Sequence, residues 1–151
     1  MRETLTAALK NAAKAKDKVR LSTIRLVLAA IKDRDIANRV AGKDPVSDEE
    51  ILQILGKMIR QREESARIYE EASRSELAVQ ERREIEVIRS FLPKQLSDEA
   101  VEQACQKIVQ ETGAQGLRDM GKCMNALKSR FSGQMDFSKA SGVVKDLLKH
   151  N

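Results

Sequence analysis

The sequence contains few of the residues from which most catalytic and metal sites are built. Its 151 residues include one histidine, His150, and two cysteines, with no CxxC pair and no histidine near either cysteine. Zinc sites and Cys–His nucleophiles need several such residues at set spacings. We therefore predict no metal, no cofactor and no catalytic residue, and we assign no such role to His150.

Tryptophan and long apolar runs are also absent. No run of eighteen apolar residues exists, and Met1-Arg2-Glu3 leads into a charged amphipathic stretch in place of an apolar signal core. A membrane-spanning helix or a secretory signal requires the missing pattern. We expect a soluble, cytoplasmic protein with no membrane partner. Cys105 and Cys123 each fall in step with apolar neighbours and are expected to be buried, unreactive thiols.

The residues that are present have a composition typical of helical proteins. The chain is 41% hydrophobic and 34% charged, contains only two prolines, and shows no strand pattern or internal repeat. A chain of this length can bury a real core. Apolar residues recur three and four positions apart, which is the period of an amphipathic helix. We predict an all-α fold.

Turn and capping residues mark where the predicted helices begin and end. Two helices are joined near Lys16-Asp17, and a third begins with Ser47 and Glu50 in the capping-box relation and runs to about Ala72. A fourth helix ends before Pro93, because proline disfavours helical geometry in the residue preceding it.

Pro93 is also the best candidate for a domain boundary. Ser97 is placed to cap a fifth helix, which stops at Gly113. Two short helices follow, near residues 119–131 and 136–149. We predict an N-terminal domain of long helices over 1–93 and a small three-helix domain over 94–151.

Basic residues are concentrated near the N-terminus. Residues 1–43 hold eleven Lys and Arg against four acids, residues 44–93 hold eight against twelve, and residues 94–151 hold nine against seven. The net charge is +5. A basic surface attracts polyanions at long range, although most charge runs on helices are only solvated faces.

The order and spacing of several short motifs resemble the YqeY family over essentially the whole chain. They are Arg20-Leu21, Arg25 to Lys32, Arg62 to Ser65 with Tyr69, Leu77 with Glu81 and Glu84-Ile85, Phe91 to Leu96, and Asp119-Met120-Gly121-Lys122 with Met124, Gly133 and Asp136. The family is related to the tail domain of GatB, the B subunit of the tRNA-dependent amidotransferase. The resemblance implies an all-helical protein whose longer N-terminal part precedes a small C-terminal helical domain.

The sequence departs from the family pattern in three places. Relatives commonly carry Gly-Arg where this chain has Ser73-Arg74, and a second glycine in place of Asn125. Their Gly-Arg-Ala-Asp turn corresponds here to the four residues from Gly133 to Asp136, with Gln134 replacing the arginine. If that arginine contacts phosphate in relatives, Arg130 or Lys139 would have to replace it.

The resemblance also implies contact with tRNA, or with a tRNA-handling enzyme such as an aminoacyl-tRNA synthetase or an amidotransferase, by a protein without chemistry of its own. Amides at a helix start near Asp119 could receive a phosphate, and a glycine beside them allows close approach. Basic residues nearby add charge. The predicted RNA-binding residues are Gly121, Lys122, Lys128, Arg130, Gly133 and Lys139.

The same residues also have purely structural explanations. Asp119 could cap the helix with its own carboxylate and repel an anion, and Gly121 and Gly142 could let neighbouring helices pack closely. Gly133 is most simply a helix C-terminal cap. Phe131 and Phe137 match core positions, so that any RNA recognition is expected to use shape and backbone and not base sequence.

Two further hypotheses stay open at this point. The family link to glutamine-dependent amide transfer suggests a carbon–nitrogen ligase, although the sequence has no Gly-rich phosphate loop and no Ser/Lys pair. The acids of residues 63–71 stand at helical spacing to Arg60, Arg67 and Arg74, which favours surface ion pairs over catalysis. Alternatively, Leu26 and Ile36 lie off the main apolar stripe of their helix, which leaves a strip for a protein partner or a second copy of the chain.

Overall fold

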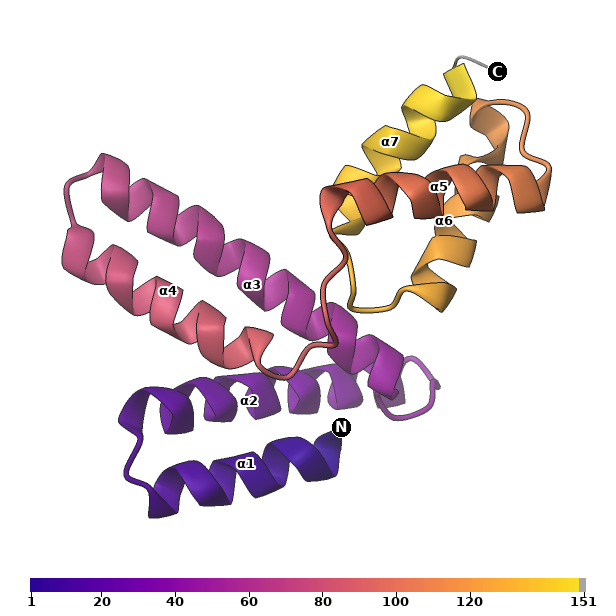
Figure 1. The fold of residues 1–151 in the computed structure, drawn as a ribbon. Helices are drawn as coiled ribbons and strands as arrows, with labels where there is room; N and C mark the ends of the chain where they lie inside the picture. Colours follow the sequence, from indigo (N-terminus) through magenta and orange to yellow (C-terminus); the bar gives the residue numbers. More distant parts are fainter. Residues whose placement is uncertain (150–151) are drawn as a thin grey trace. The chain divides into compact units, whose positions relative to one another are not determined.

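The computed structural model describes residues 1–149, and within them the chain forms seven α-helices, one 3₁₀ turn and no β-strand, which confirms the all-α prediction (Figure 1). By their contacts the helices divide into two compact units, with the division between Leu92 and Pro93. The helices of the first unit are α1 (Arg2–Lys14), α2 (Lys18–Val40), α3 (Asp48–Glu71) and α4 (Ser75–Arg89). The second unit contains α5 (Asp98–Thr112), η1 (Leu117–Asp119), α6 (Met120–Arg130) and α7 (Phe137–Lys149).

Local capping explains where two helices of the first unit, α2 and α3, begin. The Asp17 side chain accepts a hydrogen bond from the Arg20 amide at 3.1 Å and starts α2. Ser47 and Glu50 form both halves of a capping box at the start of α3, as the sequence predicts. α3 and α4 then lie side by side as a helical hairpin (Figure 1).

The N-terminal unit is held by one buried apolar cluster, to which all four helices contribute. Its two buried polar side chains are satisfied locally, because Thr23 donates to the Val19 carbonyl at 2.7 Å and Asn38 donates to the Asp44 carbonyl at 3.1 Å. The cluster consists of Leu5, Val27, Ile31, Val46, Ile51, Leu55, Met58, Ile59, Ile85 and Ile88.

A charged clasp joins α1, α2 and the loop before α3. Arg2 donates both guanidinium ends to Asp35, at 2.8 and 2.6 Å, and Asp35 also accepts from the Val46 amide at 2.8 Å. The bidentate geometry makes this pair stronger than an ordinary surface ion pair. The hydrogen bonds from Arg2 and from the Val46 amide lower the pKa of Asp35 from 3.8 to about 2.

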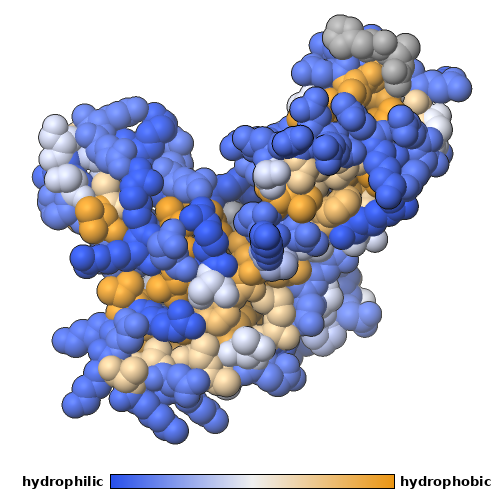
Figure 2. Space-filling model, viewed as in Figure 1, coloured by the Kyte–Doolittle hydropathy of each residue, from blue (hydrophilic) through white to orange (hydrophobic). Residues whose placement is uncertain are grey.

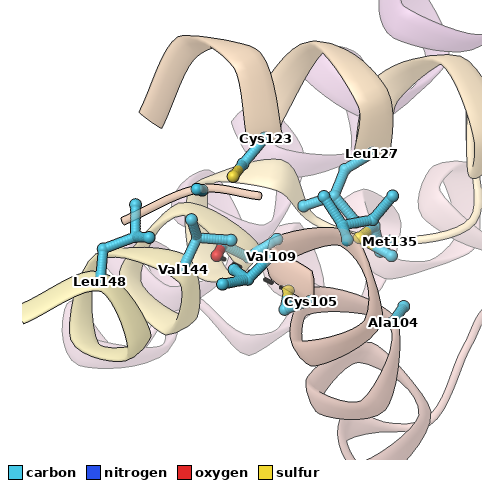
Figure 3. Close-up of a cluster of buried hydrophobic side chains, with 11 residues drawn as sticks. Ala104, Cys105, Val109, Cys123, Leu127, Met135, Val144 and Leu148 are labelled. Atoms are coloured by element: carbon cyan, nitrogen blue, oxygen red, sulfur yellow. Dashed lines mark hydrogen bonds between the residues drawn. The ribbon is translucent and has the colours of Figure 1, made fainter. Parts of the chain in front are cut away.

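The C-terminal unit has its own core, formed by the inner faces of α5, α6 and α7 (Figure 3). Cys105 and Cys123 are both fully buried in it, as expected from their apolar neighbours. Desolvation raises the pKa of the Cys105 thiol, which keeps it protonated. Gly113 ends α5 in the left-handed conformation at φ 67°, the role that its position predicts.

Ser73 offers a test of backbone strain in the turn between α3 and α4. Its φ is 58°, a left-handed conformation that costs a side-chain-bearing residue roughly 1–2 kcal/mol. We expect Ser73→Gly to raise the free energy of unfolding by about 0.5–1 kcal/mol, since the extra chain entropy of glycine offsets part of the gain. Urea unfolding followed by circular dichroism measures the change.

Ala72→Gly is the matched control, because Ala72 has a φ of −87° and gains nothing from glycine. It is expected to lower stability. Equal effects of the two substitutions would contradict the strain argument.

The clasp predicts a pH dependence. Because the folded pKa of Asp35 lies below its unfolded value, the contribution of this carboxylate is fully present above about pH 4 and is lost as the pH falls toward 2. We expect Asp35→Asn to lower the urea midpoint at pH 7, and the gap to the native chain to shrink between about pH 4 and pH 2. Asp33→Asn, a change at an exposed neighbour, is the control. A gap that stays constant with pH would rule out the titration of Asp35 as its source.

Candidate nucleic-acid interface

At the start of α6, Asp119 neither caps the helix nor leaves the neighbouring amides free for a phosphate, the two alternatives that the sequence suggests. The 3₁₀ turn η1 runs directly into α6, and the Asp119 side chain makes no capping bond to that helix. It reaches backwards and accepts from the Gln115 amide at 2.9 Å. This bond lowers the pKa of Asp119, so the carboxylate is firmly ionised. The capping prediction was therefore wrong, because the loop before η1 competes for the same oxygen atoms.

The backbone amides at this end are also engaged. The Asp119 amide donates to the Gly116 carbonyl at 2.9 Å, and the Met120 amide donates to the Leu117 carbonyl. These two donors are not free to receive a phosphate, and the ionised Asp119 stands beside them. The prediction of a phosphate bound by the amides near Asp119 is thus contradicted for this pair.

The glycines of α6 and α7 do not serve helix packing. A Cβ atom placed on Gly121 or on Gly142 would meet no atom within 4 Å, and both residues are exposed. The close-packing explanation was wrong for both positions. Because Gly121 has no side chain, the backbone of α6 is open to solvent at this position.

Two lysines flank the exposed backbone at Gly121. Lys122 and Lys128 are exposed, and the offset of six positions between them corresponds to a rise of about 9 Å and a rotation of roughly 120° around the helix. Gly121, Asn125 and Ser129 lie in the arc between them and are exposed as well. We call these five residues the α6 face.

The α6 face could be recognised only in part from the sequence. Gly121, Lys122 and Lys128 were predicted as site residues. Asn125 was noted only as a difference from the family pattern, and Ser129 was not predicted. Their common feature is small size at helical spacing, a signal that needs the bounds of α6 to be known.

The other predicted basic residues do not join the α6 face. Arg130 forms an ion pair with Glu111 of α5, and the other carboxylate oxygen of Glu111 lies 3.9 Å from the ammonium nitrogen of Lys107. Lys139 is exposed on α7. Of the predicted cations, Lys122 and Lys128 therefore lie on one helix face, whereas Arg130 is engaged in an ion pair with Glu111 and Lys139 belongs to a different helix.

The turn after α6 holds parts of the C-terminal unit together. Gly133 has φ 74°, but α6 is capped by Phe131, so the prediction that Gly133 is the cap itself was wrong. The Gln134 carbonyl accepts from the Leu96 amide at 2.9 Å, which ties the turn to the start of the unit. Met135 is buried in the core.

Several motif residues of the N-terminal unit proved to be structural contacts. Arg20 lies 5.1 Å from the centre of the Phe91 ring, a cation–π distance. Arg62 on α3 and Glu84 on α4 form a half-buried ion pair at 3.6 Å. Burial, with Glu84 nearby, raises the pKa of Glu81. The Arg20–Phe91 and Arg62–Glu84 contacts could not be predicted from the sequence, because the partners are far apart in the chain.

The charged residues of α3 form surface ion pairs. Arg67 pairs with Glu64 and with Glu71, one helical turn away in each direction. This confirms the surface ion pairs that the spacing favours for that residue. Glu63 and Glu70 pair instead with Arg89 and Arg82 of α4. Within residues 1–149, no group of three or more His, Cys, Asp or Glu is placed to hold a metal ion, and no helix is both long and apolar enough to cross a membrane.

Fold and surface together define a class, an all-helical protein of two compact units whose C-terminal unit exposes a lysine-flanked helix face. A family model described as Yqey-like protein matches residues 2–148. The chain therefore belongs to the YqeY family, which confirms the resemblance seen in its motifs.

Curated relatives come from yeasts and share one name, "Altered inheritance of mitochondria protein 41, mitochondrial". The protein from Clavispora lusitaniae is 31% identical over 149 residues, which cover 96% of this chain and 83% of the relative. That from Vanderwaltozyma polyspora is 29% identical over 147 residues, covering 91% and 77%. A third, from Lachancea thermotolerans, is 37% identical over 84 residues, covering 56% and 43%.

Gly121→Ala separates a packing role from a ligand-approach role. Because the added methyl group meets nothing and alanine favours the helix, we expect stability to rise by up to about 1 kcal/mol. Gly142→Ala on α7 should behave alike. Thermal unfolding measures both variants. A clear loss of stability in either would show that its glycine is needed for the fold.

Proposed function

We propose that this protein is a non-catalytic accessory factor that contacts tRNA through its C-terminal unit, with the α6 face as the contact surface. Lys122 and Lys128 would bind phosphates of the RNA backbone. The small residues between them would let the backbone approach the helix. The observation that carries this proposal is the pairing of two exposed lysines with an exposed glycine that the fold does not require.

The charges of the α6 face support a polyanionic ligand. Within residues 1–149, neither Lys122 nor Lys128 takes part in an ion pair, whereas Arg130 does. Unpaired cations release counterions on binding phosphate without first breaking an internal contact. The ionised Asp119 disfavours a phosphate immediately beside its carboxylate, so the phosphate bound by Lys122 is expected on the side of that lysine toward Lys128.

The aromatic residues favour recognition of shape. Phe131 and Phe137 are partly buried against the core of the C-terminal unit, so they are not free to stack on unpaired bases. Phosphate contacts fix position without reading sequence. We therefore expect binding to several tRNA species with similar affinity.

An accessory role follows from the family relation and not from the fold alone. In the related GatB protein the tail domain is implied to touch tRNA while another domain performs the chemistry. By that analogy, this chain would act beside an aminoacyl-tRNA synthetase or an amidotransferase. No arrangement of described residues favours the carbon–nitrogen ligase alternative.

A filter-binding titration of bulk tRNA at two salt concentrations tests the proposal. We expect Lys122→Glu/Lys128→Glu to weaken binding strongly and to reduce the slope of log affinity against log salt by about 1 to 2, since each lost phosphate contact contributes about 0.7–0.9. Arg130 is left unchanged because a glutamate there would face Glu111 and disturb the fold.

Lys145→Glu/Lys149→Glu is the matched control, with the same change of charge on exposed residues of α7. It should weaken binding less and leave most of the salt slope in place. Equal losses in both double variants would point to unspecific attraction by net charge. Absence of binding by the native chain at low salt would refute the RNA proposal.

A further inference from the structure

α2 carries a second apolar stripe that its own unit does not use. Leu26, Ile36 and Val40 are 47%, 44% and 84% exposed, which confirms the expectation for the first two. Ala29 and Asp33 are exposed as well. These five positions follow one another at intervals of three, four, three and four residues. Figure 2 shows apolar side chains at the surface of the N-terminal unit among charged ones.

This interval is the signature of a helix seam. An apolar residue every three and four positions is the a/d pattern with which one helix packs against another in a coiled coil. The stripe spans fifteen residues, whose fourteen steps correspond to about 21 Å along the axis. The opposite side of α2, with Val27 and Ile31, is buried in the core. We call the stripe from Leu26 to Val40 the α2 seam.

A row of cations runs along one side of the α2 seam. Arg25, Lys32 and Arg39 are spaced seven residues apart and are all exposed, so they repeat at the same place beside the seam in successive heptads. In the described part of the chain, none of the three forms an ion pair, in contrast to Arg34 on the neighbouring face, which pairs with Glu50. In coiled coils such flanking charges select the partner helix.

An open groove lies beside the C-terminal half of the α2 seam. It has a volume of about 430 Å³ and is lined by Lys32, Asp35, Ile36, Arg39, Lys43 and Pro45. The one acid in this lining is already bound to Arg2. The groove therefore presents cations around an apolar floor, which suits a carboxylate-bearing side chain with an apolar stem.

From this pattern we propose that the α2 seam is the docking site for an amphipathic helix of a different protein. That helix carries apolar residues at heptad spacing, and acidic residues along the side that meets Arg25, Lys32 and Arg39. The proposal concerns the N-terminal unit and does not depend on RNA contact by α6.

Asp33 argues against a second copy of the chain as the partner. It stands at the centre of the α2 seam, so parallel, in-register pairing of two copies brings one Asp33 against the other. Antiparallel pairing brings the two cationic rows together. Like charges at a helix interface are destabilising, whereas an asparagine or lysine of a different helix can face Asp33 favourably.

The apolar residues argue against RNA as the occupant. Phosphate contacts account for the row of cations but would leave Leu26, Ile36 and Val40 in water. Burial of these side chains against a partner helix removes their apolar surface from water and favours binding. A helix satisfies both features of the surface at once.

The experiment uses the full chain and two synthetic helical peptides of three heptads. Both have leucine at the a and d positions and asparagine at the position facing Asp33. One carries glutamate at the flanking positions and the other carries lysine there. Fluorescence anisotropy with labelled peptides measures the two affinities. We expect the acidic peptide to bind and the basic peptide to bind at least tenfold more weakly.

Two variants with matched controls locate the contact. Ile36→Asp should weaken binding of the acidic peptide at least tenfold, while Ile68→Asp, at an equally exposed residue of α3, should not. Lys32→Glu/Arg39→Glu should reverse the preference toward the basic peptide, while Lys10→Glu/Lys14→Glu on α1 should preserve it. Circular dichroism verifies that each variant is folded.

Four results would overturn the proposal. They are no binding of the acidic peptide, equal binding of both peptides, equal losses at residues 36 and 68, and a dimer in sedimentation that Ile36→Asp abolishes, since the last would make a second copy the occupant. If tRNA binding were lost in Lys32→Glu/Arg39→Glu without any binding of the acidic peptide, the α2 seam would be an RNA surface. Loss of tRNA binding in Lys122→Glu/Lys128→Glu is a separate result and tests only the α6 face.

Discussion

Burial of one apolar stripe per helix is the interaction on which the rest of the structure depends. The helices have 11 to 24 residues; isolated helices shorter than about 12–15 residues are marginal in water, and in proteins most of the stability of a helix comes from packing. Each unit satisfies this need with its own cluster, and no residue belongs to both. The outer faces of the helices therefore contribute little to either core. An exposed apolar residue or glycine on such a face is informative, because packing of the core does not account for it.

The two outer faces that stand out differ in chemistry. The α6 face joins lysines to small polar residues and has no large apolar side chain, which suits a hydrated, charged ligand. The α2 seam joins cations to Leu26, Ile36 and Val40, which suits a ligand that is acidic and apolar together. On the two proposals above, one chain would hold two different partners on separate helices. An adaptor between an RNA and a protein of a tRNA-handling complex would need such a division of surfaces.

Features fixed by local spacing were predictable from the sequence, and features fixed by distant contacts were not. The all-helical fold, the capping box of Ser47 and Glu50, and the left-handed Gly113 follow from neighbours in the chain. The role of Asp119 could not be predicted from its neighbours, because its side chain accepts a hydrogen bond from the Gln115 amide, across the 3₁₀ turn, and does not cap α6. The Arg62–Glu84 ion pair could not be predicted either, because the two residues come together only when α3 and α4 pack. For the candidate site, the lysines were recognisable, whereas their grouping required the helix bounds.

The placement of the rare residues has a practical consequence. The sole tyrosine, Tyr69, is in α3, and both cysteines are buried in the C-terminal core. Each unit thus contains a spectroscopic or chemical reporter that the other lacks. Tyrosine fluorescence follows only the N-terminal unit, and the rate of thiol labelling follows only the opening of the C-terminal one. The cooperativity between the two units can be read from the unmodified chain, without an engineered probe.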